Sequence, residues 1–116
     1  MSIEASIQSA LGSLVGNRVY PDVTPDNPVF PLIVYQQVGG VVINPMDGSD
    51  PNLDNARMQV VVWSKTRLEA SGIARAARIA MASTLDSTAF AAPVSLYEET
   101  LKLYGSRADY SLWYSP

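Results

Sequence analysis

Residues 55–64 constrain the fold more than any other part of this 116-residue chain, because the even-numbered positions from 56 to 62 are all apolar. The larger of these side chains are Met58, Val60 and Val62. A period of two predicts a β-strand with one buried face. A capping box, Thr66-x-x-Glu69, follows and predicts the start of a helix over residues 66–84. We therefore expect the even-numbered face of the strand to meet a helix-covered core.

A further helix is predicted over residues 2–15. Its apolar residues recur at helical spacing: Ile3, Ile7, Leu11 and Leu14. Ser2 is a suitable N-cap, and Gly16 can adopt the left-handed conformation that ends a helix. Four prolines in residues 21–31 then forbid a helix and predict a stiff, extended segment.

The remaining strands are predicted from β-rich runs bounded by turn residues, namely 18–20, 32–38, a strand that begins at 41–43, 94–101 and 103–114. Gly39-Gly40 suits a hairpin turn or a bulge. Loops are expected at 44–54 and 86–93. The last turn falls near Glu98–Glu99 or near 104–106, and the second place is preferred because it contains Gly105.

These elements predict a single α+β domain over residues 1–116. Its mainly antiparallel sheet carries two helices on one face, in the order α-β-β-β-β-α-β-β. The expected core includes Ile7, Leu11, Val60, Val62, Ile73 and Ala77. In the second helix, Leu68, Ala76 and Ile79 widen the apolar arc to about 220°, whereas packing on one sheet needs only about 100°. Either this helix contacts two layers or it is simply rich in alanine.

The composition excludes much chemistry. The chain has no cysteine and no histidine, which removes thiolate nucleophiles, disulfides and the commonest general base and metal ligand. The series Asp50-x-Asn52-x-Asp54 imitates half of a calcium loop, but Asn55 and Val61 stand where glycine and glutamate are required. We expect no enzymatic activity, no metal site and no cofactor.

Charge and hydropathy point to a soluble, cytosolic subunit. A net charge of −3 disfavours tight DNA binding, and no apolar run is long enough to span a membrane. Only 16% of the residues are charged, which is low for a domain and suggests that part of the surface is covered by partners. Candidate subunit-interface residues are Arg57, Gln59 and Trp63 on the odd-numbered strand face, together with Trp113. The two tryptophans either form an exposed patch or pack under the proline-rich segment.

Four motifs extend over most of the chain: Arg18-Val19-Tyr20-Pro21, Pro31-x-Ile33-Val34-Tyr35, Asn55-Ala56-Arg57-x-Gln59-Val60-x-Val62-Trp63, and Tyr104-Gly105-x-Arg107-x-Asp109-Tyr110-Ser111. In this order and spacing, the sequence resembles the small tail terminator, or tail completion, proteins of long-tailed (siphovirus-like) phages and prophages. The resemblance implies a sheet with two helices and a structural role without catalysis.

The resemblance also implies partners and a location. Members form hexameric rings on the head-proximal end of the tail tube, stop polymerisation of the tube protein and present a surface to the head completion or connector protein. Genome DNA passes through the ring without tight binding. The protein would be assembled in the host cytoplasm and reside in the virion. Asp47, Asp50 and Asp54 would then line the lumen or contact a neighbouring ring, in a loop expected to be the least ordered internal stretch of a free subunit.

A small-molecule-binding or regulatory α+β module is the alternative that the composition allows equally well. A deep, dry pocket with converging polar groups would indicate that alternative, whereas flat complementary edges would indicate a ring subunit.

Overall fold

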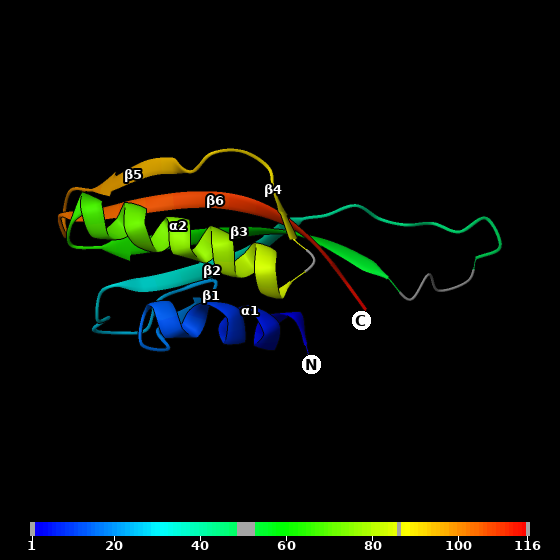
Figure 1. Ribbon diagram of the computed structural model, residues 1–116, viewed down its shortest axis with the longest axis horizontal. Helices are drawn as coiled ribbons and strands as arrows, with labels where there is room; N and C mark the ends of the chain where they lie inside the picture. The colour runs from blue at the N-terminus through cyan, green and yellow to red at the C-terminus, as the bar shows by residue number, and fades with distance from the viewer. Residues whose placement is uncertain (1, 49–52, 86, 116) are drawn as a thin grey trace.

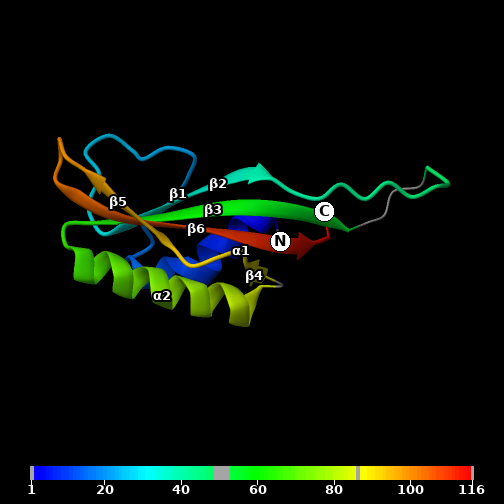
Figure 2. The ribbon, with the colours of Figure 1, turned by 90° about the horizontal axis from the view of Figure 1, so that it is seen from above.

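The computed structural model describes residues 2–48, 53–85 and 87–115, and in this part of the chain two helices lie against one face of a six-stranded sheet (Figures 1 and 2). The elements are α1 (Ile3–Leu11), the 3-10 turn η1 (Gly12–Leu14), β1 (Val19–Pro21), β2 (Leu32–Gly39), β3 (Asp54–Ser64), α2 (Arg67–Thr84), β4 (Ser87–Ala89), β5 (Val94–Glu98) and β6 (Leu103–Tyr114). The strand order is β1-β2-β3-β6-β4, and β5 also pairs with β6. Only the β1–β2 pair is parallel among these strands. The α+β class and the sheet with two helices are confirmed.

The core lies between the sheet and the helices. Along β3 the even-numbered side chains from Ala56 to Ser64 are buried, with Val60 2% and Val62 1% exposed, while Val61 on the other face is half-buried. The predicted strand register is therefore correct. Both helices contribute to this core, α1 through Ile7 and Leu11 and α2 through Ala70, Ala74, Ala77 and Met81. Of the six expected core residues, five are buried and Ile73 is partly buried against them.

Both helices begin at the predicted caps. The Ser2 hydroxyl accepts a hydrogen bond from the Ala5 N–H at 3.1 Å, and Thr66 accepts one from the Glu69 N–H at 3.2 Å. The Glu69 carboxylate does not return to the N-cap but accepts from the Ser64 hydroxyl at the end of β3. The helix α1 ends at Leu11, earlier than predicted, and the chain continues as η1. Residues 12–14 of the predicted helix thus form a tighter 3-10 turn, and Val15 leads to Gly16 with φ of 59°.

One strand prediction and one loop prediction are wrong. Residues 41–43 are not a strand, because the Val41 N–H donates to the Asn55 side-chain oxygen at 2.9 Å instead of entering a backbone ladder. The register of β2 against β3 shifts between Gln37 and Gly39, so of the two readings of the glycine pair the bulge is the correct one. Conversely, the loop predicted at 86–93 contains β4. This strand pairs antiparallel with β6, and the chain then continues to β5, which also pairs with β6.

The preferred position of the last turn is also wrong. The turn lies at residues 99–102, next to the alternative at Glu98–Glu99, and Lys102 adopts a φ of 53° there. The Glu98 carboxylate accepts hydrogen bonds from the N–H groups of Thr100 and Leu101, which stabilises this turn without a glycine. Gly105 lies inside β6 instead.

We predict that Leu11→Ala lowers the free energy of unfolding by about 2–4 kcal/mol, because a fully buried side chain leaves a cavity between the helices and the sheet. Leu68→Ala is the matched control: the same atoms are removed from a side chain that is 85% exposed, and the change should stay within about 0.5 kcal/mol. Urea denaturation of the two variants measures both values. Equal losses would contradict the core assignment.

We also predict that stability falls at alkaline pH in part through Tyr110. Burial raises the pKa of this hydroxyl above its usual value of about 10, against a smaller opposing effect of Arg78. The unfolded state therefore loses the proton first, so stability declines as the pH rises above about 10. Tyr110→Phe keeps the ring but should make the fall of unfolding free energy between about pH 9 and 11 less steep. An unchanged slope would contradict this contribution.

Candidate assembly interface

The sheet face opposite the helices carries the predicted interface residues of β3. Odd-numbered residues of β3 and β6 share this face, because β3 and β6 pair antiparallel from Asp54–Tyr114 to Ser64–Tyr104. Near the start of β2 the proline-rich segment lies on the side opposite α2 (Figure 2). The middle of the face bears polar and charged groups rather than an apolar layer. We call this surface the open face.

Arg57 and Asp109 form the central pair of the open face. The Arg57 guanidinium donates to the Asp109 carboxylate from Nε at 2.9 Å, and Nη2 of the same group lies 2.8 Å from that oxygen. The guanidinium carbon also lies 4.4 Å from the centroid of the Phe90 ring. Because the side chain of Arg57 is 46% exposed, the pair is partly solvated and contributes little to folding. The ion pair nevertheless fixes the orientation of the Arg57 and Asp109 side chains on the open face.

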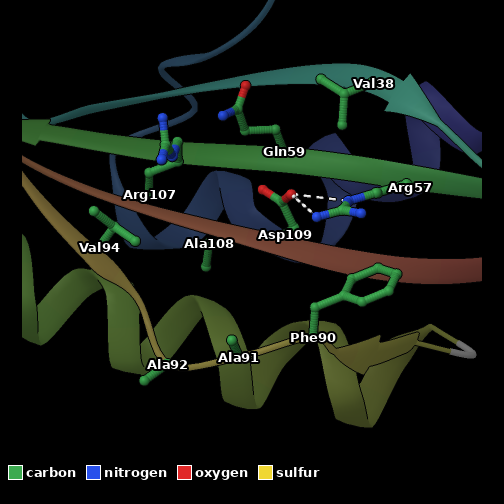
Figure 3. Close-up of a pocket in the computed structure, with 10 residues that line it drawn as sticks. All are labelled: Val38, Arg57, Gln59, Phe90, Ala91, Ala92, Val94, Arg107, Ala108 and Asp109. Carbon is green, nitrogen blue, oxygen red and sulfur yellow. Dashed lines mark hydrogen bonds and ion pairs between the residues drawn. The ribbon is translucent and has the colours of Figure 1, made fainter.

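These residues border a hollow of about 450 Å³ (Figure 3). Apolar residues from three segments form one part of its lining: Val38, Phe90, Ala91, Ala92 and Val94. Gln59, Arg107 and the ion pair add polar groups. Within the part of the chain that the structure describes, no salt bridge or hydrogen bond involves the Arg107 guanidinium. The hollow therefore has an apolar border and an excess positive charge.

Trp63 lies apart from this cluster. Its ring packs over Gly105, where an added Cβ would be 2.8 Å from the ring carbon Cζ3. It borders a second hollow, of about 180 Å³, together with Pro28, Phe30 and Leu101. The structure thus favours the alternative in which this tryptophan packs beside the proline-rich segment.

Trp113 lies at the opposite end of the sheet. It pairs with Asn55, whereas Trp63 pairs with Gly105, eight residues further along β3. At about 3.4 Å per residue, the two tryptophans are separated by about 27 Å along the strand. They share the open face but do not form one aromatic patch. Arg57 and Gln59 lie between them and border the same hollow.

Residues 40–48, which follow β2, project beyond the end of the sheet (Figure 1). We call these residues the arm. Its exposed apolar side chains are Val41 60%, Val42 76% and Met46 106%, and Leu53 next to β3 is 40% exposed. Asp47 is exposed on the arm and Asp54 is exposed at the start of β3, while the predicted Asp50 lies outside the described residues.

The side of α2 away from the core is also apolar in part. Leu68 is 85% exposed and Ile79 is 58% exposed, and a Cβ added at Gly72 would meet no atom within 4 Å. Ala76 is only partly covered. The wide apolar arc of the sequence therefore corresponds to a strip that no layer of the same subunit covers.

Sequence reasoning missed Phe90, which lies in a segment predicted to be a loop. Asp109 and Arg107 were recognisable only as charges two residues apart in a strand. Their position next to Arg57 follows from the β3–β6 register. Gln59 pairs directly with Asp109, so Arg57, two residues before Gln59, lies diagonally across from Asp109. Among the described residues no three acidic, histidine or cysteine side chains could hold a metal ion, and no helix there is long and apolar enough to cross a membrane.

Comparison with known proteins identifies the family. Residues 6–115 match the family model described as Tail completion protein gp17. The chain belongs to this family. A solved structure of the virion of a native gene transfer agent particle contains a similar chain, with 16% identity, a TM-score of 0.56, and coverage of 99% of this chain and 96% of that chain. That likeness shows a shared fold. No curated protein sequence matches.

This tail completion protein is therefore a structural protein of the phage tail and a component of the virion. The contacts of its motif residues agree with a structural role. The Arg18 guanidinium, at the first of the sequence motifs, donates to the Pro31 carbonyl at 2.9 Å and holds the two ends of the proline-rich segment together. Asn55 of the third motif accepts from Val41 and donates to Ser111 at 2.9 Å. These motif residues position loops.

We predict that Gly105→Ala destabilises the tail completion protein by about 1–3 kcal/mol, because the new methyl group collides with the Trp63 ring. Gly72→Ala is the matched control. It makes the same change in open space on a helix, where alanine should stabilise by about 0.5–1 kcal/mol. Thermal unfolding followed by circular dichroism compares the two, and a neutral Gly105→Ala would show that Trp63 is not held against β6.

Proposed function

We propose that this tail completion protein forms a ring, most simply of six subunits, on the head-proximal end of the tail tube. The ring ends polymerisation of the tube protein and offers the surface that joins the head completion or connector protein. Family membership supports a tail role, and the structural neighbour comes from a phage-like virion. The single observation that carries the ring is that one subunit has two different uncovered surfaces, the apolar arm and the open face with its hollow.

Two unlike surfaces suit a closed ring. In a ring each subunit contacts its neighbours through two different patches, and rotation about the axis closes the chain of contacts. A dimer with twofold symmetry would use one self-complementary patch instead. The exposed strip of α2, with Leu68 and Ile79, offers further surface for the tube protein or the head protein.

The charge of the chain suits the passage of DNA. Eight basic and eleven acidic residues give a net charge of −3, so a lumen formed by this protein would attract the phosphate backbone weakly. We propose that genome DNA passes without tight binding. The acidic residues Asp47, Asp50 and Asp54 lie in or next to the arm, where they either face the lumen or take part in contacts of the ring.

The alternative of a small-molecule-binding module has less support. The hollow lies over β3 and β6 and is bordered by residues of β2 and β5. The Arg57 guanidinium and the Asp109 carboxylate in its lining are already bonded to each other. Without breaking this pair, a ligand would find only Arg107 as a free charged group among the described residues that line the hollow. A deep pocket with converging free polar groups would be expected of such a module.

The ring is tested with purified protein and tail tubes assembled from the tube protein of the same virion. We expect electron microscopy to show a ring at one end of each tube, and tube lengths to stop increasing once the protein is added. Native mass spectrometry of complexes released from tube ends should give the mass of six subunits. Tubes that continue to grow at both ends in the presence of excess protein would contradict the proposal.

A further inference from the structure

The base of the arm is bound to β3. At its base the Asn55 side chain is 8% exposed, accepts from the Val41 N–H, and donates to the Ser111 hydroxyl at 2.9 Å and the Leu112 carbonyl at 3.2 Å. Gly40 lies so close to β3 that an added Cβ would be 2.3 Å from the Asn55 carbonyl oxygen. These contacts bind the first residues of the arm to β3. The described part of the arm then extends along the long axis of a molecule that measures 52 × 25 × 25 Å (Figure 1).

The arm carries the side chains of a contact surface rather than of a solvated loop. Val42 and Met46 are the most exposed apolar residues of its described part. Scattered single apolar residues are normal on a protein surface, but several on one projecting segment are typical of a site that binds protein. Residues 40–54 also contain three aspartates and no lysine or arginine, so the segment is acidic as well as apolar.

The hollow of the open face has complementary chemistry. Its apolar border is formed by Val38, Val94 and the segment Phe90–Ala92. Its charged residues are Arg57, Arg107 and Asp109, which gives one positive charge in excess. Arg57 is already paired with Asp109, so Arg107 is the cation that a second acidic group would neutralise. A volume of about 450 Å³ accommodates a few side chains but not a folded element.

We propose that the arm of one subunit occupies the hollow of the next copy in the ring. Val42 and Met46 contact the apolar border, and the acidic part of the arm around Asp47 faces Arg107. The proposal rests on the proposed ring and specifies the contact that closes it. The occupant is a second copy because the arm is acidic where the hollow is basic, and because the described part of the arm extends past the end of its own sheet (Figure 1).

Cross-linking tests the contact directly, because the natural chain has no cysteine. A Met46→Cys protein is mixed with an Ala91→Cys protein of different tag length, added to tail tubes, and treated with a short bismaleimide. We expect a covalent dimer that contains both tags. Ala82→Cys on α2 replaces Ala91→Cys in the matched control: it is also an exposed alanine, but it lies outside the hollow, and it should give no such dimer.

Reversing the charges of Arg107 and Asp47 tests the same contact through the yield of cross-linked dimer. Arg107→Glu should reduce the yield of cross-linked dimer at least about tenfold, since it replaces attraction at the contact by repulsion. Asp47→Lys in the partner protein should restore much of the yield. Arg75→Glu, an exposed arginine on α2, is the control and should leave the yield unchanged. Unchanged thermal unfolding of each variant shows that the fold is intact.

The outcomes separate this inference from the proposed function. Rings that cap tubes but give no dimer between positions 46 and 91, or give as much with position 82, overturn the arm contact and leave the ring in place. A cross-link within one chain of a Met46→Cys/Ala91→Cys protein at high dilution also overturns it, because the arm would then fill its own hollow. Absence of both rings and capping overturns the proposed function, and the arm contact with it.

Discussion

The antiparallel pairing of β3 with β6 is the interaction on which the rest of the structure depends. It extends from Asp54–Tyr114 to Ser64–Tyr104 and leaves every other side chain of both strands on the same face. One face buries Val60 and Val62 of β3 with Tyr110 and Leu112 of β6 beneath the helices. The other face aligns Arg57 with Asp109. A shift of one residue would exchange the two faces, burying charges and exposing the core, so burial itself maintains the register.

The end of this pairing also starts the second helix. Ser64 is fully buried where β3 ends, donates to Glu69, and lies 3.4 Å from the Thr66 N–H. The helix therefore begins at a point set by the strand. Arg67, one residue past the N-cap, donates to the carbonyls of Gly105 at 2.7 Å and Leu96 at 2.6 Å, which ties the same helix to β5 and β6. Hydrogen bonds thus connect the end of β3, the start of α2, and the strands β5 and β6.

Local patterns predicted most of the fold, and non-local pairing explains what they missed. The caps at Ser2 and Thr66, both helices and the face of β3 follow from spacing alone, because each signal lies within a few residues. The strand assigned to 41–43 failed because a side chain fourteen residues away, Asn55, takes the Val41 N–H. The β4 strand was not predicted because three residues are too few to show a periodic pattern. The hollow could not be predicted because its lining depends on which residues of β6 pair with β3.

Core and assembly surface are coupled through a single buried side chain. Asn55 binds the arm through Val41 and binds β6 through Ser111 and Leu112, and both of its polar atoms are thereby satisfied. A buried amide that lost one of these partners would cost about 1–3 kcal/mol, so this contact holds the first residues of the arm next to β3. An arm whose base is already held has less conformational entropy to lose on association. In the proposed ring, such preorganisation would strengthen each of the small contacts between neighbouring subunits.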